Sequence, residues 1–426
     1  MKKLLMISAV AVSLLSAEEG TEDLIMQQLE SMKTKSTTTS GFMPDISLIV
    51  DGSYNHISFD EDGHTDHLEI PGFIHGGADE HSDHMHTPLA GNDGFNFNYA
   101  EVSLGASVDS YFDLLAVFHI TEDDFETEEA YATTRSLPYH LRAKIGKFKS
   151  DFGYLNNKHE HNYNFAKMPL IYLSLLGDHG INETGAQLQY VLPSSVYVMA
   201  GIESLQGDNE QSYGVDGFLD VDDVSVPGLW VGYLKTSFDL GGGTLLGGVS
   251  IATGDSRINH LEDEHEHEED MEEEEGHAFA GDTTIYGVDL TYKKYFAADH
   301  AITWQSEYLY RNMDGTQYNA EGIGTSIEKK QAGFYSELIY QYDRNWRTGV
   351  RYSGITQNDV SINPDIPDDM YVTSAMLEYH FSEFSRVRLE YNYDSSLYSE
   401  EGEKNNKNEI SLQFNYAIGA HGAHAF

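Results

Sequence analysis

Polar and apolar residues alternate along much of the chain, most clearly near its C-terminal end. Within 409–418 the polar positions are Glu409, Ser411, Gln413 and Asn415, and the apolar positions are Ile410, Leu412, Phe414, Tyr416 and Ile418. Residues 386–394 follow the same rule. A period of two residues predicts β-strands that present one polar and one apolar face.

Short turns and longer polar segments separate these strands in alternation. Tight turns are predicted near Ser110, Pro138, Ser194, Gly242, Asp299, Asn345 and Glu383, and longer loops at 60–95, 122–127, 150–182, 207–227, 255–281, 313–328, 359–369 and 397–407. These fifteen connections join about sixteen strands. The sequence therefore predicts an all-β protein, a transmembrane antiparallel β-barrel over residues 41–426 with its long loops outside the cell. A soluble β-sandwich, which would bury the apolar face, is the alternative.

The N-terminal residues predict export. Lys2 and Lys3 precede the apolar stretch 4–15, and small residues follow at 16–17, so 1–17 is a predicted signal peptide. Residues 18–40 are a predicted periplasmic segment with helical spacing of apolar residues, or a disordered leader. We therefore expect the protein in the outer membrane of a Gram-negative cell, in contact with membrane lipid.

The last residue, Phe426, closes an alternating strand. This ending resembles the assembly signal of bacterial outer-membrane barrels, so the barrel-assembly machinery is an expected partner. A homotrimer is the usual assembly of sixteen-stranded porins.

Composition narrows the classes of partner. The chain has 28 Tyr and 20 Phe but 3 Trp, which fits strands that face lipid on one side and water on the other. Because there is no cysteine, disulfides and thiolate metal sites are excluded. The net charge of -45 disfavours nucleic acid and favours cations.

Thirteen of the 20 histidines fall in three predicted loops, among many carboxylates. They are His64, His67, His75, His81, His84 and His86 in the first loop, His159, His161 and His179 in the third, and His260, His265, His267 and His277 in the fifth. Asp178 adjoins His179. Imidazole and carboxylate together suit zinc and, less selectively, other divalent metals. Merely solvated acidic loops and pH sensing are the alternatives.

The third loop differs from the others because it contains the apolar run 170–176. Water would disfavour such a run, so we expect this loop to fold into the lumen, with His159, His161, Asp178 and His179 at the constriction. A structural plug against the wall is the alternative. Lys147 and Lys149, just before it, should lie opposite the face of Arg142 and Lys144 unless Gly146 hosts a bulge.

Residues 146–153 (GKFKSDFG), followed by a long loop, resemble a passage of the phosphate-selective porin O and P superfamily. Residues 98–109 (NYAEVSLGASVD), 128–136 (EEAYATTRS), 178–187 (DHGINETGAQ) and the ending GAHGAHAF are similar to proteobacterial zinc-regulated outer-membrane receptors or porins. The resemblance implies expression tied to zinc status and passage of zinc or a zinc complex. A TonB-dependent receptor needs about twenty-two strands and a plug, which 426 residues cannot supply, so we expect TonB-independent passage.

The predicted function is a porin-type channel for passive passage of divalent cations, zinc first, captured by the His- and carboxylate-rich loops. No cofactor is required. An anion- or phosphate-type porin and a metal-binding barrel with an occluded lumen are the alternatives. An enzyme is not expected, since neither a Ser-His-Asp arrangement nor a metalloprotease helix motif stands out.

Overall fold

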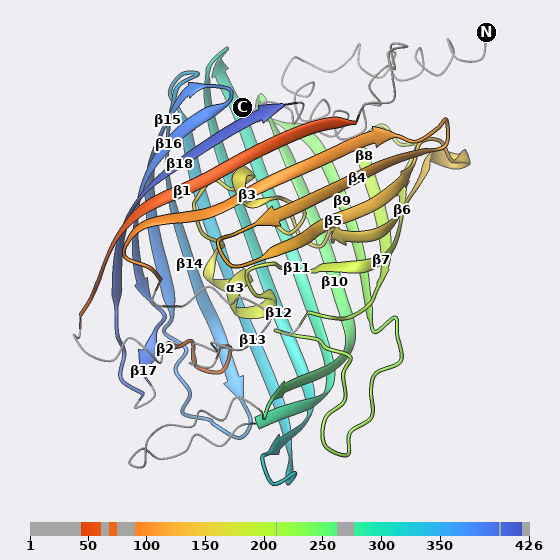
Figure 1. The fold of residues 1–426 in the computed structure, drawn as a ribbon, viewed down its shortest axis with the longest axis vertical. Helices are drawn as coiled ribbons and strands as arrows, with labels where there is room; N and C mark the ends of the chain where they lie inside the picture. The colour runs from red at the N-terminus through yellow and green to blue at the C-terminus, as the bar shows by residue number, and fades with distance from the viewer. Residues whose placement is uncertain are drawn as a thin grey trace.

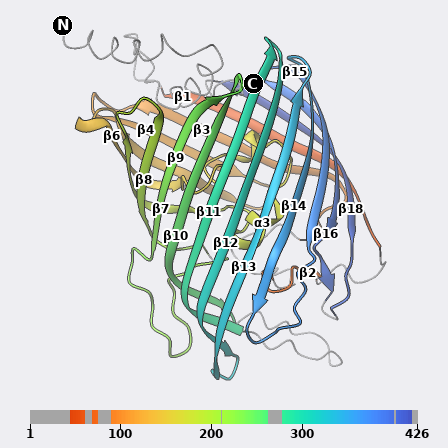
Figure 2. The same ribbon diagram turned by 180° about the vertical axis from the view of Figure 1, so that it is seen from behind.

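Sixteen antiparallel strands close into one barrel in this computed structural model, which describes residues 44–60, 68–74, 89, 91–209, 211–261, 277–399 and 402–419 (Figures 1 and 2). The ring consists of β1 (Asp45–Phe59), β3 (Gly94–Ser107), β4 (Phe112–Ile120), β5 (Phe125–Thr134), β6 (Leu141–Lys149), β7 (Asn182–Val191), β8 (Tyr197–Leu205), β9 (Leu229–Leu240), β10 (Gly243–His260), β11 (His277–Ala297), β12 (His300–Asn319), β13 (Gly324–Gln341), β14 (Trp346–Val360), β15 (Tyr371–Ser382), β16 (Ser385–Ser395) and β18 (Lys407–Gly419). β1 pairs with both β18 and β3, which closes the ring. The predicted sixteen-stranded barrel is confirmed.

The side chains on the strands are arranged as expected for a membrane barrel, with apolar residues on one face and polar residues on the other. On β18, Ile410 and Ile418 are exposed, whereas Glu409 and Asn415 on the opposite face are buried. Apolar side chains therefore face outward to lipid and polar ones face inward, as in outer-membrane barrels. The protein is an outer-membrane β-barrel, as the sequence predicts.

The wall is uneven in height. β4 to β8 have 9 or 10 residues each, whereas β10 to β13 have 18 to 21 and extend furthest toward the end opposite the tight turns (Figure 1). Strand therefore extends into both loops predicted at 255–281 and 313–328, covering 255–260 and 277–281 of the first and 313–319 and 324–328 of the second. That prediction was wrong in extent because strand pairing continues where the outward side chains become polar, as at Asp255 and Asp314, while Phe279, Met313 and Ile327 form a buried apolar cluster.

Short elements lie apart from the ring. β2 (Leu68–Glu69) and β17 (Tyr398–Ser399) form a separate two-stranded ladder, η1 (Pro138–His140) lies between β5 and β6, and η2 (Glu160–Asn162) and α3 (Leu170–Leu176) lie between β6 and β7. α3 lies inside the ring of strands (Figure 1). Within the described residues, no helix is long and apolar enough to cross a membrane. The predicted signal peptide and the segment 18–40 lie outside the described residues.

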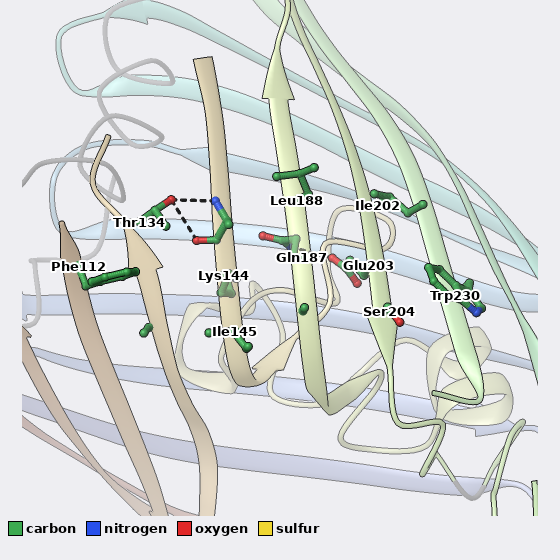
Figure 3. Close-up of a pocket in the computed structure, with 13 residues that line it drawn as sticks. Phe112, Thr134, Lys144, Ile145, Gln187, Leu188, Ile202, Glu203, Ser204 and Trp230 are labelled. Carbon is green, nitrogen blue, oxygen red and sulfur yellow. Dashed lines mark hydrogen bonds between the residues drawn. The ribbon is translucent and has the colours of Figure 1, made fainter. Parts of the chain in front are cut away.

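Small side chains leave a hollow on the outer surface of β5 to β9 (Figure 3). Ala132, Ala143 and Ala186 line it beside Ile145 and Leu188. The last two side chains are exposed, so the hollow belongs to the lipid-facing surface and not to the lumen.

The outer face of β11 offers a test of membrane depth. Val288 lies between Tyr286 and Leu290 on the apolar outer face, whereas Phe296 lies near the strand's tight-turn end. We expect Val288→Arg to lower the free energy of unfolding by about 2–4 kcal/mol and Phe296→Arg by about 0–1 kcal/mol, because a charge costs most at the bilayer midplane. Urea unfolding in lipid vesicles measures both. Equal losses would contradict this placement of the membrane.

Candidate functional site

The segment 150–181, here called the inner loop, leaves β6, passes through the interior and returns to β7. Glu203 on β8 accepts hydrogen bonds from the Ser150 hydroxyl (2.5 Å) and the Asp151 amide (3.0 Å). Leu170, Ile171 and Leu175 belong to a buried apolar cluster together with wall residues. The prediction that the third loop folds into the lumen is confirmed.

A buried carboxylate on β12 holds the first part of the inner loop. Glu307 accepts hydrogen bonds from the backbone amides of Tyr154 (2.8 Å) and Leu155 (3.0 Å). It also accepts from the hydroxyls of Tyr172 (2.8 Å) and Tyr335 (2.5 Å). One side chain thus links the loop, α3 and the wall.

Arginines on the later strands hold the middle of the inner loop through its carbonyl oxygens. Arg386 donates to the carbonyl of His161 (2.8 Å), Arg388 to that of Tyr163 (2.9 Å) and Arg351 to that of Lys167 (2.8 Å). Glu390 accepts from the Ala166 amide, and Glu409 pairs with the Lys167 ammonium at 2.6 Å. The loop therefore reaches from β6 across the lumen to β18.

On the β3–β5 side, the inner loop inserts one imidazole between three carboxylates. His159 Nδ1 lies 3.3 Å from Glu101 Oε2 and 3.1 Å from Glu128 Oε2, and its Nε2 lies 2.9 Å from Glu129 Oε2. Lys149 Nζ pairs with the other oxygen of Glu128 at 3.0 Å. We call these five side chains the His159 cluster. One ligand atom each from Glu101, Glu128 and His159 lies within 4.8 Å of the others, close enough to hold one metal ion.

A β-bulge makes this arrangement possible. The register of β4 against β5 shifts between Val117 and Phe118, whose partners are Glu129 and Thr127, so Glu128 is an extra residue in β5. Neighbouring residues of a regular strand point to opposite faces, but Glu128 and Glu129 are both buried. The bulge turns two successive carboxylates toward the inner loop.

The His159 cluster is strongly charged and shielded. Burial alone would lower the pKa of His159, but the carboxylates of Glu128 and Glu101 outweigh it and raise that pKa well above the usual range. His161 Nδ1 lies 3.0 Å from Glu101 Oε2, and its ring stacks on that of His159. Within the described part of the chain, Glu101 Oε1 is buried without a hydrogen-bond partner. The cluster therefore has an unused buried acceptor.

The predicted metal ligands separate into several groups. The structure places His159 and His161 together, whereas Asp178 and His179 form a partly exposed pair at 3.6 Å. His260 and His277 face each other across β10 and β11, with ring centroids 5.8 Å apart. The others lie outside the described residues: His64, His67, His75, His81, His84, His86, His265 and His267.

Sequence reasoning missed the three glutamates of the His159 cluster. Glu101 and Glu129 lie within strands whose polar and apolar residues alternate imperfectly. Their position in that alternation was the only sign that they face the interior. Lys149 is buried and pairs with Glu128. No bulge interrupts the pairing of β6 with β7 at Gly146. Lys149 reaches the interior at the very end of β6, where the chain enters the inner loop.

Comparisons with known proteins agree with the fold. No protein-family model matches the chain. It is 44% identical over 408 residues to an uncharacterized protein of Aquifex aeolicus (strain VF5), covering 94% of this chain and 83% of that protein.

Two solved structures are similar in fold. One is the outer membrane channel DcaP of Acinetobacter baumannii (TM-score 0.53, 13% identity, 90% of this chain and 100% of that one). The other is OmpT, an outer membrane protein of Vibrio cholerae, folded in vitro (TM-score 0.50, 11% identity, 90% and 100%). Both likenesses are likenesses of fold alone, and the resemblance to zinc-regulated receptors stays a prediction.

Replacing Glu307 tests how the inner loop is held. In Glu307→Gln, the new amide group meets hydroxyl and backbone donors, so buried donors lose their acceptor at about 1–3 kcal/mol each. We expect the amides of Tyr154 and Leu155 to exchange hydrogen at least about tenfold faster. The control is Glu328→Gln, which removes an exposed ion pair with Lys330 and should leave these amides unchanged. Unaltered exchange in Glu307→Gln would contradict the anchoring role.

Proposed function

The chain belongs to the same protein family as the Aquifex aeolicus protein, and we propose that it is a porin-type channel for passive passage of divalent metal cations, zinc first. The channel is not an enzyme and does not depend on TonB. The external loops rich in histidine and carboxylate would collect the ion, and the inner loop would form the constriction. Fold likeness to outer-membrane barrels supports the channel architecture.

The observation that carries the cation preference is the excess of carboxylates on the inner wall and inner loop. Among the described residues, thirteen carboxylates and seven Lys or Arg side chains are buried. The carboxylates are those of Asp51, Glu101, Glu128, Glu129, Asp151, Glu183, Glu203, Asp289, Glu307, Glu337, Glu378, Glu390 and Glu409, and the cations are Lys149, Lys235, Arg311, Arg351, Arg386, Arg388 and Lys407. A lumen with this balance attracts cations and repels anions.

Several of the basic side chains are already bound in ion pairs or hydrogen bonds within the protein. Arg388 binds Glu378 at 2.6 Å, and Arg347 binds the same carboxylate at 3.0 Å. Arg351 and Arg386 hold carbonyl oxygens of the inner loop. Such paired guanidinium groups contribute little to attraction of a passing anion, which argues against the anion-porin alternative.

A metal-binding barrel with an occluded lumen is the second candidate. The inner loop bonds to strands on all sides, from Glu101 on β3 through Glu307 on β12 to Glu409 on β18. These contacts span the interior and favour a narrow or closed passage. Metal binding without conductance would distinguish this candidate from the channel.

Assembly follows from the same proposal. A homotrimer, with the lipid-facing surface of each barrel partly covered by its neighbours, fits a porin-type channel. Assembly through the C-terminal Phe426, a residue outside the described ones, stays an expectation from the sequence.

Ion selectivity in planar bilayers tests the function. We expect the purified protein to carry cation-selective current that micromolar zinc alters, because an acidic passage concentrates divalent cations. Replacing His84, His86, His265 and His267 together by Ala should weaken the zinc response while keeping cation selectivity. The control replaces His140 and His300, which lie at the tight-turn end, by Ala. An anion-selective current indifferent to zinc would overturn the proposal.

A further inference from the structure

We propose that the His159 cluster binds one divalent metal cation, which bridges the inner loop to the barrel wall. The ligands would be His159 from the inner loop, Glu101 from β3 and Glu128 from β5. The inference deepens the proposed function, on which only its consequence for transport rests. Binding itself requires the geometry of the cluster, whether or not the barrel conducts.

The spacing of the ligand atoms fits a small divalent ion. Tetrahedral zinc with bonds of about 2.0–2.1 Å places its ligand atoms about 3.3 Å apart. His159 Nδ1 lies 3.3 Å from Glu101 Oε2 and 3.1 Å from Glu128 Oε2. A single ring proton cannot point at both oxygens, whereas an ion between the three atoms would contact all of them. Three protein ligands also leave a fourth position for water or an exchanging ligand.

Two of the three ligands have a supporting partner on the side away from the ion, and Glu101 is held through its ligating oxygen. Glu129 Oε2 accepts from Nε2 of His159 at 2.9 Å, which leaves Nδ1 to face the ion. This carboxylate–histidine pairing is the usual outer shell of a metal-bound imidazole. Lys149 occupies Oε1 of Glu128 and leaves Oε2 for the ion. His161 orients Glu101 through Oε2, while Oε1 of Glu101 is buried and unpartnered.

The charges in the cluster also match a divalent ion. When a metal ion displaces the proton of the His159 imidazole, three carboxylates and the ammonium of Lys149 leave two negative charges. Glu101, Glu128 and Glu129 are each at most 6% exposed, so this excess is poorly solvated. Buried charge needs a compensating partner, and one divalent cation supplies it in full. One nitrogen and two oxygen ligands suit zinc and its first-row neighbours better than calcium.

Occupancy of this site would set how firmly the inner loop is held. His159 lies two residues before His161, whose carbonyl oxygen is held by Arg386 on β16. A bound ion would tie the loop to β3 and β5 through bonds stronger than the present hydrogen bonds. Metal arriving in the lumen would thus fix the constriction through which further metal passes.

Cobalt binding to the full-length, folded protein in detergent tests the site, since Co²⁺ reports its ligands by visible absorption. We expect His159→Gln and Glu101→Gln each to lose one equivalent of tightly bound Co²⁺ and its spectrum. Glu129→Gln should keep the site but weaken it about 10- to 100-fold, because Glu129 supports the imidazole from outside. Ions bound by the external loops are present in every variant, so they do not change the difference in bound Co²⁺ between the unaltered protein and a variant.

Matched controls separate metal binding from loop anchoring and from misfolding. Glu203→Gln loosens the start of the inner loop but should still bind one equivalent of Co²⁺. His300→Gln, at the tight-turn end of β12, should also bind one equivalent. Folding of each variant is checked by its heat-dependent electrophoretic mobility. In the unaltered protein, Zn²⁺ should slow amide hydrogen exchange over 157–163 and leave the turn at 241–242 unaffected.

Equal Co²⁺ binding by the unaltered protein, His159→Gln and Glu101→Gln would overturn the inference, as would exchange over 157–163 that ignores Zn²⁺. These outcomes do not depend on the ionic current measured in planar bilayers. Lost binding in the variants together with anion-selective current would refute the proposed function and keep the metal site. Unchanged Co²⁺ binding in the variants together with cation-selective current would refute the metal site and keep the proposed function.

Discussion

Complete pairing of the strand backbones is the constraint on which the rest of this structure depends. Lipid hydrocarbon offers no partner to an amide or a carbonyl, so a sheet within it must have no open edge. Pairing of β1 with β18 on one side and β3 on the other satisfies that requirement. Closure then fixes the direction of the side chains in regular parts of the strands, because alternate residues must face lipid or the interior.

Closure also creates a second problem inside the barrel, since it gathers carboxylates and guanidinium groups in a narrow space. The inner loop supplies partners from its own backbone. Its amides bond to Glu203, Glu307 and Glu390, and its carbonyl oxygens bond to Arg351 and Arg386. A main chain carries donors and acceptors in equal number, so one segment can satisfy walls of both signs. The apolar residues of α3 fill the remaining space.

The sequence predicted the parts of this arrangement that depend on local pattern. Alternation and tight turns give the strand number, and the run 170–176 reveals a loop that avoids water. The lengths of β10 to β13 were missed because their outward side chains become polar while strand pairing continues. The bulge at Glu128 also leaves no signal, because it depends on the register of β4. The partners of His159 are Glu101, Glu128 and Glu129, which are distant in sequence and meet it only in the closed ring.

The two sides of the inner loop are held by different kinds of bond, and this difference bears on its movement. Toward β12–β18 the loop is held mainly through backbone groups and the ion pair of Lys167 with Glu409, none of which a metal ion would replace. Toward β3 and β5 the contact passes through the imidazole of His159, whose proton and a metal ion compete for the same nitrogen. A change in the lumen's ion content therefore acts at one side while the other stays fixed. The contact of His159 with β3 and β5 is therefore the part of the loop's anchorage that responds to a metal ion.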